Sequence, residues 1–97
     1  MSTPSAKPEV THNRAMSRYE LEVDGEVAVA SYERQPGRLV FTHTVVPDSI
    51  SGRGVASTLI RGALEGARAE HLQIVPQCPF VAAFVKKHPE YQDLIAG

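Results

Sequence analysis

The chain has 97 residues, which suits one small domain and is too short for two domains that each bury a core. Its 42% apolar and 22% charged residues are typical of a folded globular protein and exclude a disordered one. Ten basic and eleven acidic side chains give a formal charge of -1, so the chain lacks the positive field of a general nucleic-acid binder.

The single cysteine excludes an intramolecular disulfide and a multi-cysteine zinc site, and it is typical of a reducing compartment. The four histidines share no spacing that would build a metal site, so we expect none. No apolar run approaches the roughly 20 residues of a membrane span, and the N-terminus lacks the apolar core of a signal peptide. These features predict a cytoplasmic protein with no membrane segment.

The first 15 residues contain two prolines, several charges and no apolar period. Such a segment has little to bury, which predicts a flexible leader over residues 1–15. The domain itself is then expected to occupy residues 16–97.

Alternation of apolar and polar residues predicts three antiparallel strands in the first half of the domain. The turns between them contain glycine, which takes positive φ without a steric penalty. In the third strand the alternation places His43 on the same face as Phe41, so we expect a partly buried imidazole. The predicted strands and turns are Tyr19–Val23, Asp24-Gly25, Val27–Tyr32, Pro36-Gly37 and Arg38–Val46.

The second half of the domain has a helical period instead. Apolar residues recur at steps of three and four from Val55 to Ala67, which predicts a helix of about four turns. A short strand at Leu72–Val75 should lie parallel to its neighbour, because a crossover helix precedes it. Pro79 suits the first residue of a second helix, and a last short helix is expected at Glu90–Ile95.

These elements predict an α+β (mixed α/β) fold. The expected architecture is a mostly antiparallel sheet of about four strands, one long helix behind a glycine loop, and two short C-terminal helices.

The glycine loop between the third strand and the long helix is a candidate anion site. A helix that begins there directs unpaired backbone N–H groups and the positive end of its dipole at one point, which attracts phosphate. Gly52 and Gly54 would let a phosphate reach the backbone, and Arg53 would add charge. The alternative is that the glycines only make a tight turn. A Walker loop is excluded because no lysine follows, and three preceding antiparallel strands exclude a dinucleotide fold.

Cys78 is a second candidate, because it directly precedes the proline that begins the second predicted helix. A helix N-terminus stabilises a thiolate and so lowers the thiol pKa, which favours a nucleophile. The alternative is a buried structural cysteine. His43 is likewise either a partly buried, hydrogen-bonded imidazole or a base that removes a proton from Cys78 or from an amine.

Four stretches of the chain, in this order and spacing, resemble the minimal stand-alone acetyltransferase-like domains of the GNAT superfamily. They are Thr42-His43-Thr44-Val45-Val46-Pro47, Gly52-Arg53-Gly54-Val55-Ala56, Val75-Pro76-Gln77-Cys78-Pro79-Phe80-Val81 and Lys87-His88-Pro89-Glu90-Tyr91-Gln92-Asp93-Leu94. The likeness spans about Tyr19 to Ile95. It implies a GNAT-type fold and an N-acetyltransferase that moves the acetyl group of acetyl-CoA to an amine.

The resemblance implies that the loop holds the pyrophosphate of acetyl-CoA and that the strand before it lies beside the pantetheine arm. The family's loop reads Arg/Gln-x-x-Gly-x-Gly/Ala. Gly54 and Ala56 match the last two fixed places, whereas Ser51 stands where Arg or Gln is usual. The cofactor-binding residues implied are Val45, Val46, Ser51, Gly52, Arg53, Gly54, Val55, Ala56 and Ser57.

The family carries a cysteine at the position of Cys78 and a histidine at that of His43, so the resemblance implies that these two residues are catalytic. Both direct attack by a bound amine and an acetyl-cysteine intermediate stay open. The alternative is a CoA-binding or protein-interaction module with little turnover, because a chain this short has few residues to enclose an acceptor. We expect a monomer whose partners are acetyl-CoA and an amine.

Overall fold

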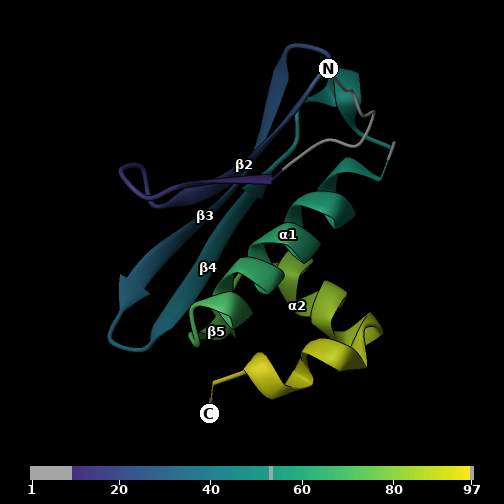
Figure 1. Cartoon of the computed structure of the whole chain (residues 1–97). Coiled ribbons are helices and arrows are strands. Elements are labelled where there is room, and N and C mark those ends of the chain that lie inside the picture. The colour runs from purple at the N-terminus through teal and green to yellow at the C-terminus, as the bar shows by residue number, and fades with distance from the viewer. Residues whose placement is uncertain (1–9, 53, 97) are drawn as a thin grey trace, which may run out of the picture.

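A five-stranded sheet with its helices on one face forms the protein, as seen in a computed structural model that describes residues 10–52 and 54–96 (Figure 1). The strands lie in the order β1-β2-β3-β4-β5; the first four are antiparallel, and β5 is parallel to β4. The elements are β1 Val10–Asn13, β2 Arg18–Val23, β3 Glu26–Gln35, β4 Arg38–Val45, the 3-10 turn η1 Asp48–Ile50, α1 Val55–Ala69, β5 Gln73–Pro76, α2 Pro79–Lys87 and the 3-10 helix η2 Pro89–Leu94.

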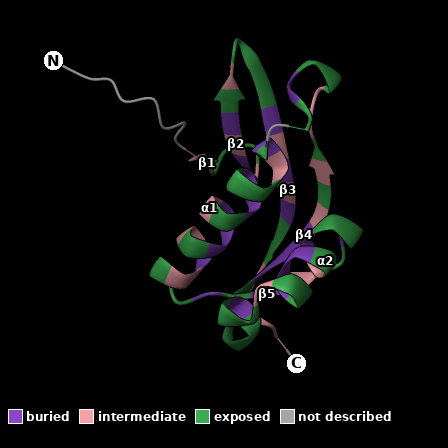
Figure 2. Cartoon of the chain, turned by 90° about the vertical axis from the view of Figure 1, so that its right-hand side faces the viewer, coloured by how far each residue is buried: buried purple, intermediate pink, exposed green. Residues whose placement is uncertain are grey.

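The core lies between the sheet and the two α-helices. The inner side of α1 and the strand residues beneath it are buried, whereas the outer side of α1 is exposed (Figure 2). The face of α1 with period three to four is buried, as the sequence predicts, and it packs on β1, β2, β3 and β5. The predicted α+β class and the parallel crossover to β5 are therefore confirmed.

The strand count differs from the prediction, because β1 lies inside the expected leader. Val10–Asn13 pairs with β2, so the leader does not extend to residue 15, and residues 1–9 lie outside the described residues. The inward residues of β1 are Val10, which packs on the core, and His12, whose ring stacks on Tyr19 at 4.1 Å. A histidine in an inward position hides the apolar alternation that identifies a strand.

Gly62 in α1 permits β1 to approach the helix. A Cβ placed on Gly62 would lie 2.5 Å from Cγ2 and 2.6 Å from Cβ of Val10. Gly62→Ala gains about 1 kcal/mol of helix propensity, yet we expect a net loss of about 1–3 kcal/mol because β1 must shift. Thermal unfolding measures this loss. Val10→Gly removes both clashing atoms, so Gly62→Ala should be stabilising in that background; the same loss in both backgrounds would contradict the contact.

His12 makes the stability of the fold depend on pH. Its Nε2 lies 2.6 Å from the Tyr32 hydroxyl, and its Nδ1 faces Glu70 at 3.8 Å. Burial and then Arg14 lower the pKa of His12, and Glu70 only partly opposes them. The pKa of His12 is therefore lower in the folded protein than in the unfolded chain, so the unfolded chain takes up a proton at a higher pH. We therefore expect the free energy of unfolding to fall as pH drops below about 6.5. His12→Gln should flatten this part of the stability profile, measured by denaturant unfolding at several pH values; an unchanged slope would assign the effect to other groups.

Candidate functional site

A β-bulge in β4 sets the direction of the side chains at the site. Ser31 of β3 lies opposite His43, but the next residue, Tyr32, lies opposite Phe41, so Thr42 is an extra residue in β4. An extra residue reverses the alternation of a strand beyond it. Odd-numbered residues of β4 therefore point to one face of the sheet before Thr42 and to the other face after it.

The bulge corrects the predicted orientation of His43. Thr44 lies opposite the buried Ala30 and so takes the face that the helices cover. His43 takes the other face, which carries no helix of the described chain, and its side chain is exposed, with Nδ1 3.0 Å from the Thr42 hydroxyl. The expectation of a partly buried His43 beside Phe41 is wrong, and the structure does not bring His43 to Cys78.

Thr44 instead contacts the thiol. Cys78 is the N-cap residue of α2, and Pro79 begins that helix, as the sequence predicts. The backbone N–H of Cys78 donates to the carbonyl oxygen of Phe41 at 2.8 Å, which fixes the thiol beside β4. The Thr44 Oγ1 lies 3.3 Å from the Cys78 Sγ, and only 4% of Cys78 is exposed.

The surroundings of Cys78 act on the thiol in opposite directions. Burial, the largest single influence, raises the pKa of Cys78. The Thr44 hydroxyl and the backbone N–H groups of Val81 and Phe80 favour the thiolate and together outweigh burial, so the pKa lies below its ordinary value. The site thus combines a shielded sulfur with donors that stabilise its anion.

The sheet opens next to Cys78. β5 pairs with β4 only over Arg38–Phe41, so the rest of β4, Thr42–Val45, has no strand on its outer side among the described residues. Val45 is 56% exposed at the end of this stretch, and Val46 packs on the edge of the core. A ligand with amide groups could therefore hydrogen-bond along this free strand edge.

The chain then enters the glycine loop, which leads to α1. Gly52 and Gly54 have φ of +80° and +72°, and a Cβ on either would meet no atom within 4 Å. The glycines are thus required first by backbone conformation, while the space above them is open. The Ser51 hydroxyl donates to the carbonyl oxygen of Asp48 within η1. Arg53 lies outside the described residues.

The N-terminus of α1 has no internal cap. Gly54 is the N-cap, no side-chain oxygen bonds the first turn, and that turn has no acidic residue. Among the described residues the N–H groups of Val55, Ala56 and Ser57 have no partner outside the helix, so they can serve an external acceptor. Val55 is buried and Ser57 is exposed, so the first contributes its backbone alone whereas the second adds a hydroxyl.

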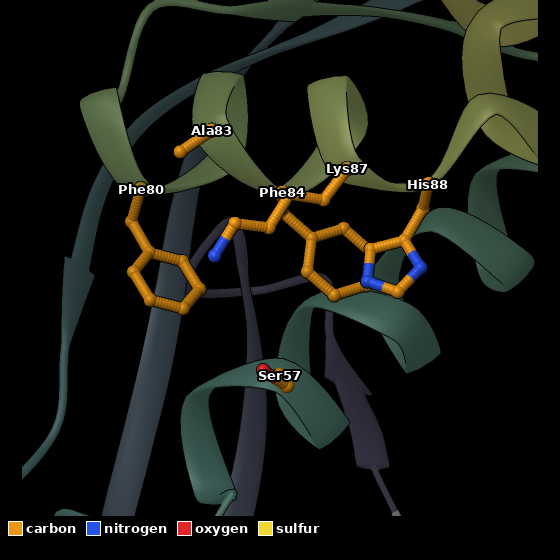
Figure 3. Close-up of a pocket in the computed structure, with 6 residues that line it drawn as sticks. All are labelled: Ser57, Phe80, Ala83, Phe84, Lys87 and His88. Carbon is orange, nitrogen blue, oxygen red and sulfur yellow. The ribbon is translucent and has the colours of Figure 1, made fainter.

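A pocket of about 150 Å³ lies between the first turn of α1 and the side of α2 that faces it. Figure 3 shows the rings of Phe80 and Phe84 directed from α2 toward Ser57 on α1. The lining residues are Ser57, Phe80, Ala83, Phe84, Lys87 and His88.

Two parts of this site have no clear sequence signal. The inward position of Thr44 depends on the bulge, and the alternation of the sequence predicts the opposite face for it. The apolar pattern of the second helix predicts that Phe80 faces inward, yet it is 39% exposed and lines the pocket. Within the described parts of the chain, no group of three metal-ligating side chains comes together and no helix is long and apolar enough to cross a membrane.

The fold and site define an acyltransferase-like domain of the GCN5-related type, and comparisons with known proteins agree. The family model for GCN5-related N-acetyl-transferases matches residues 18–94. The chain therefore belongs to this family.

Individual proteins and a solved structure are also similar to this chain. Protein NATD1 of Bos taurus is 35% identical over 83 residues, which cover 82% of this chain and 74% of that protein. Protein NATD1 of Homo sapiens is 34% identical over the same shares of the two chains. The NMR structure of a GCN5-like protein from Staphylococcus aureus superposes with a TM-score of 0.71 at 25% identity and covers 96% of this chain and 92% of its own.

Proposed function

We propose that the protein is an acetyl-CoA-dependent N-acetyltransferase that uses Cys78 as its acyl-accepting thiol. The observation that carries this proposal is the free edge of β4. Cys78 lies at the inner end of this edge, and beyond its outer end the chain leads into the uncapped N-terminus of α1. A thioester carrier with amide groups and a phosphate end would need a thiol, a free strand edge and a phosphate-binding helix N-terminus, in this order.

The residues present fit coenzyme A. The free N–H groups of Val55, Ala56 and Ser57 would hold the pyrophosphate, with Gly52 and Gly54 giving the loop its shape. Ser51 and Arg53 belong to the same loop, and Arg53 is proposed to add the positive charge that Ser51 lacks. The free edge of β4 at Val45 and Val46 would bind the pantetheine amides, and its N–H groups would polarise the thioester carbonyl.

Cys78 provides the chemistry in this proposal. Its thiolate attacks the acetyl carbonyl carbon, a new C–S bond forms, the thioester bond breaks, and coenzyme A leaves as a thiolate. The amine then attacks the acetyl-cysteine carbon, the C–S bond to Cys78 breaks and returns its electron pair to the sulfur, and the amine nitrogen gives its proton to a base, His43 in this proposal. Direct attack of the amine on acetyl-CoA is the competing route and needs no thiol.

His43 takes a different part from the one first expected. Because it lies on the face opposite Thr44, it is proposed as a base for an amine that arrives from that face, and not for Cys78. Thr44 holds the thiolate instead.

One observation favours a second function. Cys78 is only 4% exposed, which would suit a CoA-binding or protein-interaction module with little turnover. The two functions are separated by mixing the protein with acetyl-CoA and a panel of primary amines and measuring the release of coenzyme A. Multiple turnovers with at least one amine support the enzyme; saturable binding without release supports the module.

A further inference from the structure

We propose that the outer face of the sheet, the face opposite the helices, selects the acceptor, and that the acceptor is a primary amine whose aliphatic chain ends in a second positive charge. The inference rests on the proposed function, because it names the substrate class of the same acetyl transfer. The surface that carries it begins at His43, the proposed base, and extends across β3 to β2.

The outer face is open to an acceptor, because both α-helices pack against the opposite face (Figure 1). The register of β2, β3 and β4 arranges its side chains in rows that cross the three strands. Starting from the proposed base, these rows are His43-Ser31-Arg18, Val45-Val29-Glu20 and Val27-Glu22. An amine held at His43 can therefore extend the rest of its chain over the two rows that follow.

Valines make the middle of this face apolar. Val45 and Val27 are 56% and 43% exposed, and the half-buried Val29 lies opposite Val45 and two residues from Val27. Side chains that lie opposite each other on one face of a sheet are in reach of each other, and so are diagonal neighbours. The three valines therefore form one apolar strip from the free edge of β4 toward β2. Burying an aliphatic chain along this strip is favourable.

The strip ends at a carboxylate that is free to bind a cation. Glu22 lies opposite Val27, and its carboxylate has no hydrogen bond or ion pair with another described residue. The neighbouring Glu20 carboxylate is occupied, since it accepts from Arg18 Nε at 2.6 Å and from Asn13 Nδ2 at 3.0 Å. The charge of Glu22 therefore favours a ligand whose apolar chain ends in a cation.

The positions of His43 and Glu22 set the length of that chain. Arg18 lies in the row of His43, and Glu22 follows it by four residues on β2, which is the second strand from β4. With about 3.4 Å per residue and about 4.8 Å between strands, His43 and Glu22 are roughly 17 Å apart. A hydrogen bond of about 3 Å at each end leaves roughly 11 Å, which a chain of about eight carbons spans.

Other amines use this surface less well. An amino acid carries a carboxylate beside its amine, which Glu20 and Glu22 would repel. A short neutral amine reaches His43 but leaves most of the valine strip uncovered. A peptide lysine would place polar backbone groups on the strip without a partner. A long aliphatic amine with a cationic end uses the base, the strip and the carboxylate together.

The test compares octylamine, aminooctanoic acid and diaminooctane, each substituted at its chain ends, by kcat/KM for coenzyme A release from acetyl-CoA. Diaminooctane should react roughly fivefold more efficiently than octylamine, as expected for one exposed ion pair, and aminooctanoic acid less efficiently than both. Glu22→Gln should remove the preference for the diamine. The matched control is Glu33→Gln, which removes the same charge from the outer face on the other side of His43 and should retain the preference.

Val27→Thr tests the strip separately. It should lower kcat/KM about threefold with octylamine and leave butylamine unaffected, because the shorter chain ends before Val27. Equal efficiencies of the three acceptors in the wild-type protein, or the same loss in both glutamate variants, would overturn the assignment of Glu22. A Val27→Thr protein that uses octylamine as well as the wild type does would overturn the strip.

The failure of this inference can be distinguished from that of the proposed function. Release of coenzyme A with other primary amines but not with these long-chain ones would overturn the acceptor class and leave the acetyltransferase in place. No release with any amine would defeat both.

Discussion

Replacing Cys78 by serine should lower acetyl transfer by about 100-fold or more and leave the affinity for acetyl-CoA nearly unchanged. Serine keeps the size of the side chain and its contact with Thr44, so the fold is retained. The hydrogen-bond donors around the Cys78 sulfur outweigh burial and lower the pKa of the thiol, which makes it a nucleophile. A serine hydroxyl at this position is not ionised in this way. Rates of coenzyme A release and a binding isotherm measure the two quantities.

Controls on Thr44 and His43 make this prediction specific. The pH at which iodoacetamide reacts at half its maximal rate should lie below about 8.5, the value of a free cysteine. Thr44→Val should raise this midpoint, because it removes the hydroxyl 3.3 Å from the sulfur. His43→Ala should leave it in place, since His43 lies on the other face of the sheet. A Cys78→Ser protein with full activity would leave direct transfer as the enzymatic route.

Replacing Gly54 by glutamate should reduce acetyl-CoA affinity by at least about 100-fold. The new carboxylate would lie at the uncapped N-terminus of α1 and repel the pyrophosphate. The residue must also keep a φ of +72°, which costs roughly 1–2 kcal/mol for a side chain with a Cβ.

Gly37→Glu is the matched control for this backbone strain. Gly37 has a φ of +73° and equally open space, but it lies in the turn between β3 and β4, where its carbonyl accepts from the N–H of Gln73 in β5, and not at the N-terminus of α1. We expect a comparable loss of stability and an unchanged affinity, from thermal unfolding and calorimetry. Equal losses of affinity in both variants would mean that the loop is not the phosphate site.

Much of the fold could be predicted because its elements follow simple periods. The stripe from Val55 to Ala67 identifies α1, and the proline after Cys78 identifies the start of α2. The turn at Pro36-Gly37 and the parallel crossover to β5 could likewise be predicted from the residues of these segments alone. Membership of the GCN5-related family, which the resemblance implied, is confirmed.

The errors come from features that period alone cannot reveal. β1 was missed because His12 occupies an inward position and gains its partners, Tyr19 and Tyr32, only in the folded sheet. The face of His43 was wrong because the bulge at Thr42 depends on pairing with β3 and not on the residues of β4 alone. A single extra residue exchanged the places of His43 and Thr44, and with them the predicted partner of the thiol.

Intact-protein mass spectrometry after mixing the protein with acetyl-CoA and no amine is the most direct test of the proposed function. We expect the mass of one acetyl group to appear, to map to Cys78 after proteolysis, and to disappear when the acceptor amine is added. The Cys78→Ser protein should stay unmodified. A wild-type protein that acetylates an amine at full rate with no trace of acetyl-Cys78, or that shows neither modification nor turnover, would contradict the proposed role of the thiol.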